Sequence, residues 1–423
     1  MLRSLSKFAA PVAGERLSVS FPDFTFRRWR PCPSRSRLWA GLGVLVGTLG
    51  ASMAPCFAES LPAPRALTLP SAAPSGYPVV DRITVVYYPA ALAFQPTPAV
   101  VAVPPSGSST RDPIMRRLAR HLAGQGIACA VIDLPYHGQR HLRGVAPAAP
   151  YLEGSVAASV QALGQGASDV RTVAAWLATQ PGIDPHRLGV VGISLGAIVA
   201  HLAMGEDTRL TAGVAVLGGG NLPDLSQKSL LVRLLRRLYS RWLDPATLGG
   251  LAVVDPLTYA SQNRPRHVLM IEAARDLLVP PRDSTELWEA LGRPPIQWLD
   301  VNHFALGLTP DAAFRATSAY LWSVWNGHPA LTGDALPQAA APTLKVGLLA
   351  QWGRPITPSL QWQFHTFAWR RDHISLIHAD FGLTGRGPFL GLGATVTPFV
   401  DLGVSPRFDG RGVRPYAAFH VVL

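Results

Sequence analysis

The sequence predicts an α/β fold with a mostly parallel sheet, helices on both of its faces and a cap insertion, followed by a small antiparallel β region. Apolar runs alternate with helical patterns between residues 81 and 326, which is typical of repeated β-α units. After residue 342 the pattern changes to short alternating segments separated by Gly, Pro and Asp. Because 48% of the 423 residues are hydrophobic and 15% are charged, we expect a large core and little disorder.

Residues 1–58 are predicted to be a signal peptide. A basic stretch, Arg27 to Arg37, precedes an apolar run from Leu38 to Met53, and small residues at Cys56 and Ala58 suit cleavage after Ala58. An uncleaved N-terminal anchor is the alternative. We therefore expect export, to the periplasm or cell envelope of a bacterium. Only Cys129 would remain after cleavage, so the mature chain could form no internal disulfide.

The net charge of +12 is unevenly distributed. Half of it falls in residues 1–58, which hold eight Lys or Arg residues and two acidic ones. The remaining positive charge is too dilute to indicate a nucleic-acid partner.

Residues 59–80 are rich in Pro, Ala and Ser and are predicted to be a linker. The domain that follows, 81–326, should contain strands and helices in alternation. The expected strands are 82–88, 99–104, 127–134, 187–192, 211–217, 267–273 and 296–301. The expected helices are 113–124, 168–180, 286–291 and 311–325.

Two insertions interrupt this alternation. Residues 139–165 show no clear pattern, and residues 218–265 include an amphipathic helix at 228–243 with several arginines on its polar face. We interpret 218–265 as a cap over the substrate pocket. The alternative is an ordinary helix packed on the domain.

Residues 327–342 are predicted to be a second linker, and residues 343–423 an antiparallel β module. In its first strand one face carries Leu344, Val346, Leu348, Ala350 and Trp352. A membrane barrel needs at least eight strands of roughly 9–11 residues. We therefore expect that five or six short strands cannot close alone. A soluble β module is favoured, with outer-membrane association through this region as the alternative.

The segment Gly192-Ile193-Ser194-Leu195-Gly196 points to a nucleophilic serine. It follows an apolar strand and precedes a helical run of small residues. In a G-x-S-x-G turn the glycines leave room for a strained backbone that lifts the serine hydroxyl above the sheet. The amide groups at the start of the helix then point at the same place, where they can stabilise an oxyanion.

Two later residues complete a candidate triad. Asp276 follows an apolar strand in the segment Asp276-Leu277-Leu278-Val279-Pro280, and His303 follows the last predicted strand. An imidazole can take the serine proton, and a carboxylate can orient and stabilise the imidazole. Asp300 and Asp283 are rival candidates for the acid.

Over about residues 80–326 the chain resembles the α/β-hydrolase superfamily, whose triad has this Ser, Asp, His order. The resemblance implies a mostly parallel α/β-hydrolase sheet, catalytic Ser194, Asp276 and His303, and an oxyanion hole that includes the Leu195 amide. The usual His-Gly oxyanion loop is replaced here by Pro104-Pro105-Ser106-Gly107. Proline has no N–H to donate, so we expect Ser106 to supply the second amide.

The segment Asp133-Leu134-Pro135-Tyr136-His137-Gly138 looks like a turn found in many members of this superfamily, and its expected role is to support the oxyanion loop. His137 is therefore interpreted as structural. His121, His141, His186 and His201 have no partner pattern and are interpreted as surface or helix-face residues. No metal-ligand spacing or nucleotide loop is evident, so we expect neither a metal nor a cofactor.

These features predict an exported serine hydrolase that cleaves carboxylic esters through an acyl-enzyme. The expected substrate is a small-molecule or lipid-like ester. Two alternatives stay open: an acyltransferase or serine peptidase on the same fold, and a non-catalytic surface or binding protein whose β tail associates with the outer membrane.

Overall fold

The computed structural model describes residues 61–422, apart from 92–95, 148, 153–154, 229–244, 305–309, 329–330, 332–342, 365–369, 372–373, 398 and 408–411. The predicted signal peptide, most of the predicted helix 228–243 and most of the predicted linker 327–342 lie outside the described residues. No helix in the described ranges is long and apolar enough to cross a membrane.

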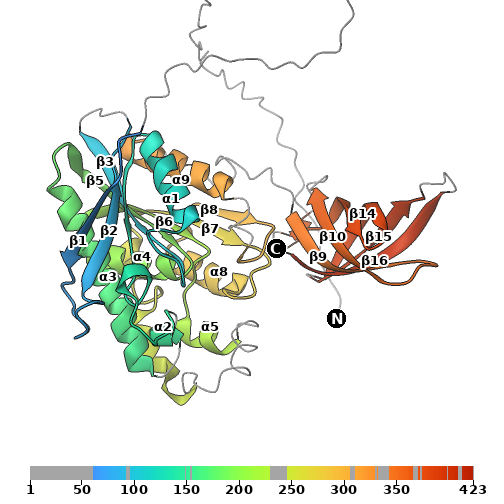
Figure 1. Cartoon of the computed structure of the whole chain (residues 1–423), viewed down its shortest axis with the longest axis horizontal. Helices are drawn as coiled ribbons and strands as arrows, with labels where there is room; N and C mark the ends of the chain where they lie inside the picture. The colour runs from blue at the N-terminus through green and yellow to red at the C-terminus, as the bar shows by residue number, and fades with distance from the viewer. Residues whose placement is uncertain are drawn as a thin grey trace, which may run out of the picture. The chain divides into compact units, whose positions relative to one another are not determined.

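A twisted sheet of eight strands forms the centre of the first part of the chain (Figure 1). Its spatial order is β1-β2-β4-β3-β5-β6-β7-β8. Strand β2 pairs antiparallel with β1 and β4, and every other neighbouring pair is parallel. The strands are β1 (Arg65–Pro70), β2 (Arg82–Tyr88), β3 (Thr97–Val103), β4 (Ala128–Ile132), β5 (Ile183–Ile193), β6 (Leu210–Val216), β7 (His267–Ala273) and β8 (Ile296–Leu299). The predicted α/β fold class is confirmed.

Strand β1 corrects the expectation that residues 59–80 are a linker. It lies along the edge of the sheet and pairs with β2 over its whole length. Only Leu67 and Leu69 pack against the core, while the positions between them are exposed. Such a short half-covered strand carries too little apolar pattern to be recognised among prolines and alanines.

Helices cover both faces of the sheet, and each face has its own hydrophobic core. Helices α1 (Pro113–Gly124) and α9 (Asp311–Trp325) pack on one face, with Leu118, Leu122 and Tyr320 buried there. Helices α3 (Val156–Ala178), α4 (Leu195–Glu206) and α8 (Pro281–Ala290) cover the other face. The two layers hold the carboxyl ends of the parallel strands in place, where ligands bind in open α/β sheets.

Helix α3 begins twelve residues before its predicted start, so the expectation of an irregular 139–165 segment is wrong for its second half. Ser155 caps the helix by accepting a hydrogen bond from the Ala158 amide, at 3.2 Å. The short helix α2 (Ala149–Leu152) and the 3-10 turn η1 (Gly138–Arg140) lie in the same segment. In the first turns of α3 only Val156, Val160 and Leu163 are large and apolar among Ala, Gly, Ser and Gln, so the hydrophobic pattern is weak.

The described part of the 218–265 insertion consists of α5 (Leu222–Lys228), η2 (Pro245–Val254) and α7 (Ala260–Asn263). Leu222, Leu225, Leu248 and Leu251 are buried. Leu222, Leu248 and Leu251 belong to the core that α3 and α4 also enter. This part of the insertion therefore packs on the domain; the predicted helix 228–243, which should form the cap, is not described beyond its first residue.

The C-terminal region is a closed antiparallel barrel with the strand order β10-β13-β14-β15-β16-β9. Its strands are β9 (Thr343–Gln351), β10 (Thr357–Phe364), β13 (Ile377–Thr384), β14 (Gly387–Thr397), β15 (Val400–Pro406) and β16 (Val413–Val422). A separate two-stranded ribbon joins β11 (Arg370–Arg371) to β12 (Ile374–Ser375). The expectation that five or six strands cannot close alone is therefore wrong.

Inward-facing glycines explain how six strands can close. The bore holds the rings of Phe389 and Tyr416, which meet edge to face with centroids 5.0 Å apart. A Cβ added at Gly391 would lie 2.7 Å from Phe389 and 2.8 Å from Tyr416. A Cβ would also collide with a ring or with the neighbouring backbone at several other positions, Gly347, Gly382, Gly393 and Gly403. Removing these side chains lets the strands approach across a very narrow bore.

Candidate active site

The turn between β5 and α4 holds Ser194 in a strained conformation, with φ 56° and ψ −118°. Its amide donates a 2.8 Å hydrogen bond to the carbonyl of Val216 on the neighbouring strand β6. A Cβ at Gly192 would collide with the Gly196 carbonyl, and one at Gly196 would lie 2.7 Å from the Pro104 oxygen. Both positions therefore require glycine, as the G-x-S-x-G pattern predicts.

Three predicted site residues come together at the carboxyl edge of the sheet. Ser194 Oγ lies 2.8 Å from His303 Nε2, and His303 Nδ1 lies 2.7 Å from Asp276 Oδ2. Each of these residues is less than 10% exposed. Serine, imidazole and carboxylate thus form one hydrogen-bonded chain from three separate loops.

The other oxygen of Asp276 fixes the carboxylate. Oδ1 accepts hydrogen bonds from the backbone amides of Leu278 and Val279, both at 2.8 Å. Oδ2 is therefore directed at the imidazole, where it selects the tautomer that carries its proton on Nδ1. This leaves Nε2 of His303 as the atom able to accept the serine proton.

The rival acids are engaged elsewhere. Asp300 Oδ1 lies 2.6 Å from Arg275 Nε, in an ion pair whose side chains are at most 3% exposed. Asp283 is on α8 and contacts Arg282 at 3.2 Å. The Arg275–Asp300 pair connects the loop that bears Asp276 to the loop that bears His303, a link that sequence reasoning missed.

The predicted oxyanion donors lie on two segments. Leu195 is the first residue of α4, where a helix has no internal acceptor for the amide. The segment before Ser106 lies against the elbow, because the Val103 and Pro104 carbonyls are the atoms that block a side chain at Gly196. The role of the Ser106 amide stays a prediction.

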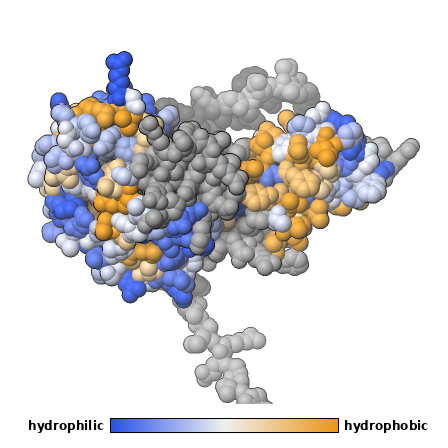
Figure 2. All heavy atoms as spheres, turned by 90° about the horizontal axis from the view of Figure 1, so that it is seen from below, coloured by the Kyte–Doolittle hydropathy of each residue, from blue (hydrophilic) through white to orange (hydrophobic). Residues whose placement is uncertain are grey.

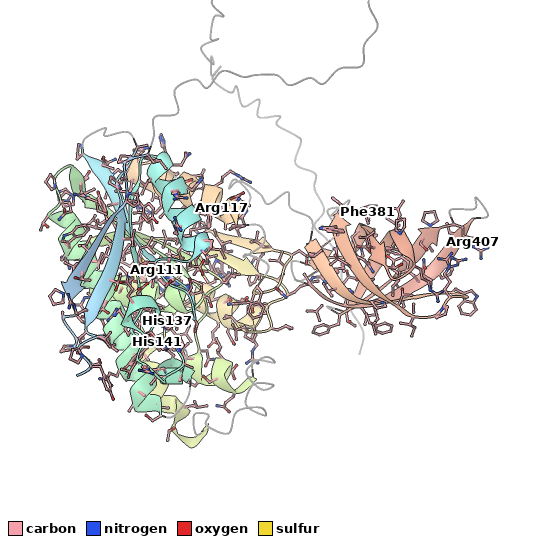
Figure 3. The ribbon with its side chains drawn as sticks, viewed as in Figure 1. Arg111, Arg117, His137, His141, Phe381 and Arg407 are labelled. Atoms are coloured by element: carbon pink, nitrogen blue, oxygen red, sulfur yellow. The ribbon has the colours of Figure 1, made fainter. Side chains whose placement is uncertain are left out.

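The Asp133–Gly138 segment supports the loop that follows β3, as its sequence predicts. Asp133 Oδ1 accepts a 2.6 Å hydrogen bond from the Thr110 amide, and Oδ2 accepts one from Gln139 at 2.9 Å. His137 is fully buried, with Nδ1 2.8 Å from the Pro135 carbonyl; Figure 3 labels it within the domain. Gly138 has φ 52°, and any side chain there would collide with Asp133.

A buried ion pair, which no sequence pattern predicted, anchors this segment to α3. Arg140 Nη1 lies 2.7 Å from Asp169 Oδ2, and both side chains are fully buried. Arg140 also donates to the carbonyls of Val80, at 2.7 Å, and Asp133, at 2.9 Å. Burial raises the pKa of Asp169, an effect that the Arg140 charge and the Ser71 hydroxyl partly offset.

Glu272, at the end of β7, is a second carboxyl near Asp276. Burial, together with the charge of Asp276, raises the pKa of Glu272 well above its ordinary value of 4.5, against the lowering effect of a Ser284 hydrogen bond. Its surroundings therefore disfavour the charged form of Glu272. Asp276 is the carboxyl that contacts the imidazole, at 2.7 Å.

Two further findings concern histidines outside the candidate triad. His201 lies on α4, as the helix-face interpretation expects, but it is 2% exposed, so its interpretation as a surface residue is wrong. In the barrel, His378, Asp380 and Asp401 place possible ligand atoms within 4.8 Å of one another. The ammonium group of Lys345 already lies 3.0 Å from Asp380 and 2.5 Å from Asp401. Lysine thus occupies the space between the carboxylates where a cation would bind.

Comparison with known families gives one match. Residues 158–311, just over a third of the chain, match the model of the prolyl oligopeptidase family. The matched range includes Ser194, Asp276 and His303. A sequence comparison with curated proteins gives no match.

Several solved structures are similar. An esterase from an Arctic intertidal metagenomic library is 18% identical, with 61% of this chain and 92% of that one covered and a TM-score of 0.44. A Pyrococcus furiosus esterase is 15% identical, with coverage of 62% and 92% and a TM-score of 0.44. An acylaminoacyl peptidase of Pyrococcus horikoshii is 13% identical, with coverage of 65% and 42% and a TM-score of 0.46. The fold assignment rests on the strand order and the elbow.

Proposed function

We propose that this chain is a serine hydrolase that cleaves carboxylic esters through Ser194, His303 and Asp276. The observation that carries the proposal is the 2.8 Å contact between Ser194 Oγ and His303 Nε2, backed by Asp276 at 2.7 Å. A base within hydrogen-bond reach of a hydroxyl on a strained elbow is the arrangement that nucleophilic catalysis requires.

In the proposed reaction, Ser194 Oγ attacks the carbonyl carbon of the ester while its proton moves to His303 Nε2. The Leu195 and Ser106 amides stabilise the oxyanion. As the tetrahedral intermediate collapses, His303 gives the proton to the departing alcohol and an acyl-enzyme remains. Water then attacks the acyl group, again with His303 as the base, and the carboxylic acid leaves as Ser194 regains its proton.

Peptide hydrolysis is the second candidate, favoured by the match of residues 158–311 to the prolyl oligopeptidase family. The triad performs acyl transfer whether the leaving group is an alcohol or an amine, so the two candidates share one site. Ester hydrolysis is the first choice because an alcohol is an easier leaving group than an amine, so the shared triad has a lower barrier to overcome with an ester.

Turnover of chromogenic ester and peptide substrates distinguishes ester hydrolysis from peptide hydrolysis. The purified chain is given p-nitrophenyl esters of short and medium acyl chains, and p-nitroanilides of short peptides that include proline. We expect ester turnover that Ser194→Ala abolishes and that the exposed-site control Ser261→Ala preserves. Peptide turnover without ester turnover would overturn the ester assignment, and ester turnover retained in Ser194→Ala would overturn the nucleophile.

We also propose that the chain is exported, on the basis of the basic and apolar pattern of residues 27–58. The expected result of cell fractionation is recovery in the periplasm or envelope. N-terminal sequencing of that material should begin at Glu59. Recovery in the cytoplasm would contradict export.

A further inference from the structure

In the barrel of strands β9, β10 and β13–β16, charged side chains face the interior and apolar side chains face outward. This is the reverse of the usual arrangement for a protein in water. Side chains alternate between inside and outside along each strand. The charged side chains Lys345, Asp380 and Asp401 point inward and are at most 1% exposed. Their ion pairs fill the interior, together with the rings of Phe389 and Tyr416.

The outward positions are apolar on all six strands. We call this ring of side chains the apolar belt. Figure 2 shows hydrophobic side chains gathered over the barrel, and Figure 3 shows Phe381 on its outer surface. One member from each strand is between 46% and 50% exposed: Leu348, Phe364, Phe381, Leu392, Leu402 and Phe419. No charged residue with a described side chain in these six strands is classed as exposed.

The shape of the belt decides what can cover it. A protein partner or a second copy covers one side of a barrel, whereas this belt runs around the whole circumference. Strand addition is also unavailable, because the closed order β10-β13-β14-β15-β16-β9 leaves no edge. The hydrocarbon of a lipid bilayer is the environment that surrounds a barrel on all sides.

The barrel has fewer strands than the eight assumed above for a membrane barrel, but its inward glycines already let six strands close. Strands β9, β14 and β16 have the 9–11 residues of a membrane strand, and β10, β13 and β15 are one or two residues shorter. The six strands have seven to eleven residues. At about 3.4 Å per residue and a tilt of about 40°, they span roughly 18–29 Å along the barrel axis. The apolar band of membrane barrels is about 25 Å tall.

One end of the barrel carries positive charge. Arg354, Arg386, Arg407 and Arg414 line an open pocket of about 340 Å³, and no acidic residue lines it. Figure 3 labels Arg407 at this end. Arginines just beyond an apolar band are placed to bind the phosphate groups of lipid heads.

We propose that the barrel inserts its apolar belt into a phospholipid bilayer, with the four arginines at the level of the headgroups. This anchors the chain to a membrane through strands and does not depend on the proposed activity. In the interior, Lys345 pairs with Asp380 and Asp401, so these charged groups have partners within the barrel where lipid would offer none.

The test measures protection of single cysteines in the full chain by vesicles of phosphatidylethanolamine and phosphatidylglycerol. Leu392→Cys places a thiol in the middle of the belt. Val253→Cys, an apolar residue 58% exposed on the hydrolase domain, is the matched control. A membrane-impermeant maleimide is added, and its adducts are counted peptide by peptide, which separates these sites from the native cysteines.

We expect vesicles to slow labelling at position 392 about tenfold or more and to leave position 253 unchanged. Adding Phe381→Lys, also in the middle of the belt, should reduce vesicle partition on the order of 30-fold or more and restore labelling at position 392. Adding Val413→Lys next to Arg414, at the headgroup level, should change partition less than about fivefold.

Equal labelling of position 392 with and without vesicles would overturn the proposal, even if another segment brings the chain to the membrane. Protection of position 392 without lipid that grows with protein concentration would show that a second copy covers the belt, and would overturn it as well.

Discussion

At the residue scale, the identity of the acid is decided by hydrogen bonds. Asp276 reaches His303 Nδ1 at 2.7 Å, while Asp300 is held by Arg275 at 2.6 Å. Asp276 was predicted as the acid because it follows a strand, but the sequence does not show why Asp300 is unavailable to orient His303. The partner of Asp300 lies 25 positions away on another loop, and chain spacing carries no information about such a pair.

We therefore predict different effects for two asparagine variants. Asp276→Asn should lower kcat for an ester by roughly 10³–10⁴-fold, because an amide cannot hold the imidazole in the required tautomer or stabilise its charged form. Asp300→Asn should lower kcat far less, since it disturbs only the pairing of two loops. Steady-state kinetics on both variants check this, and a larger loss in Asp300→Asn would reverse the assignment.

His201 provides a second residue-scale prediction, on stability. Burial lowers the pKa of His201 from 6.5 to about 4. The native state then binds fewer protons than the unfolded state between these two values, so stability falls as pH drops through that window. Once the pH is below both values, this effect should have lowered the free energy of unfolding by roughly 3 kcal/mol relative to neutral pH.

The variant His201→Leu should remove this part of the pH dependence. Urea unfolding of both proteins between about pH 4 and 7 measures it, and the two curves should diverge most at the acid end. Parallel curves would show that the pKa of His201 is not lowered in the native state.

At the element scale, the prediction from sequence worked best where the apolar pattern is continuous, either along one face of a helix or through a whole buried strand. Helices α1 and α9 have their predicted bounds, and so does β7. Strand β1 and the first turns of α3 were missed. Leu67 and Leu69 give only two alternations, and the start of α3 has few large apolar residues among small and polar ones. Packing against β2 and the sheet decides their structure, and local propensity does not.

The buried pair of Arg140 and Asp169 leads to a prediction about how elements are held together. Arg140→Met should cost about 3–5 kcal/mol of stability, since it leaves the Asp169 carboxyl buried without its partner and releases the Val80 and Asp133 carbonyls. The double variant Arg140→Met/Asp169→Leu should recover part of the loss, because no buried charge remains.

Chemical denaturation with a shared m-value measures these differences. A double variant no more stable than Arg140→Met would show that the carbonyl contacts of Arg140, rather than its charge, hold η1 to the sheet.

At the whole-molecule scale, the sheet and the site were within reach of the sequence, and barrel closure was not. The order Ser194, Asp276, His303 and the strand before each residue indicate one edge of one sheet. The alternation in β9 was also recognised, but alternation alone does not say which face is inside. The inward glycines and the pairing of Lys345 with Asp380 and Asp401 determine which face is inside. These contacts join strands far apart in the chain, so the pattern within one strand does not show them.

Covalent labelling of the folded chain with a fluorophosphonate, followed by mapping of the adduct, tests the roles of Ser194 and His303 most directly. We expect one adduct, on Ser194, with labelling slowed on the order of 10³-fold or more in His303→Ala because no base then takes the serine proton. An adduct on another serine, or labelling of Ser194 that is unchanged in His303→Ala, would contradict these roles.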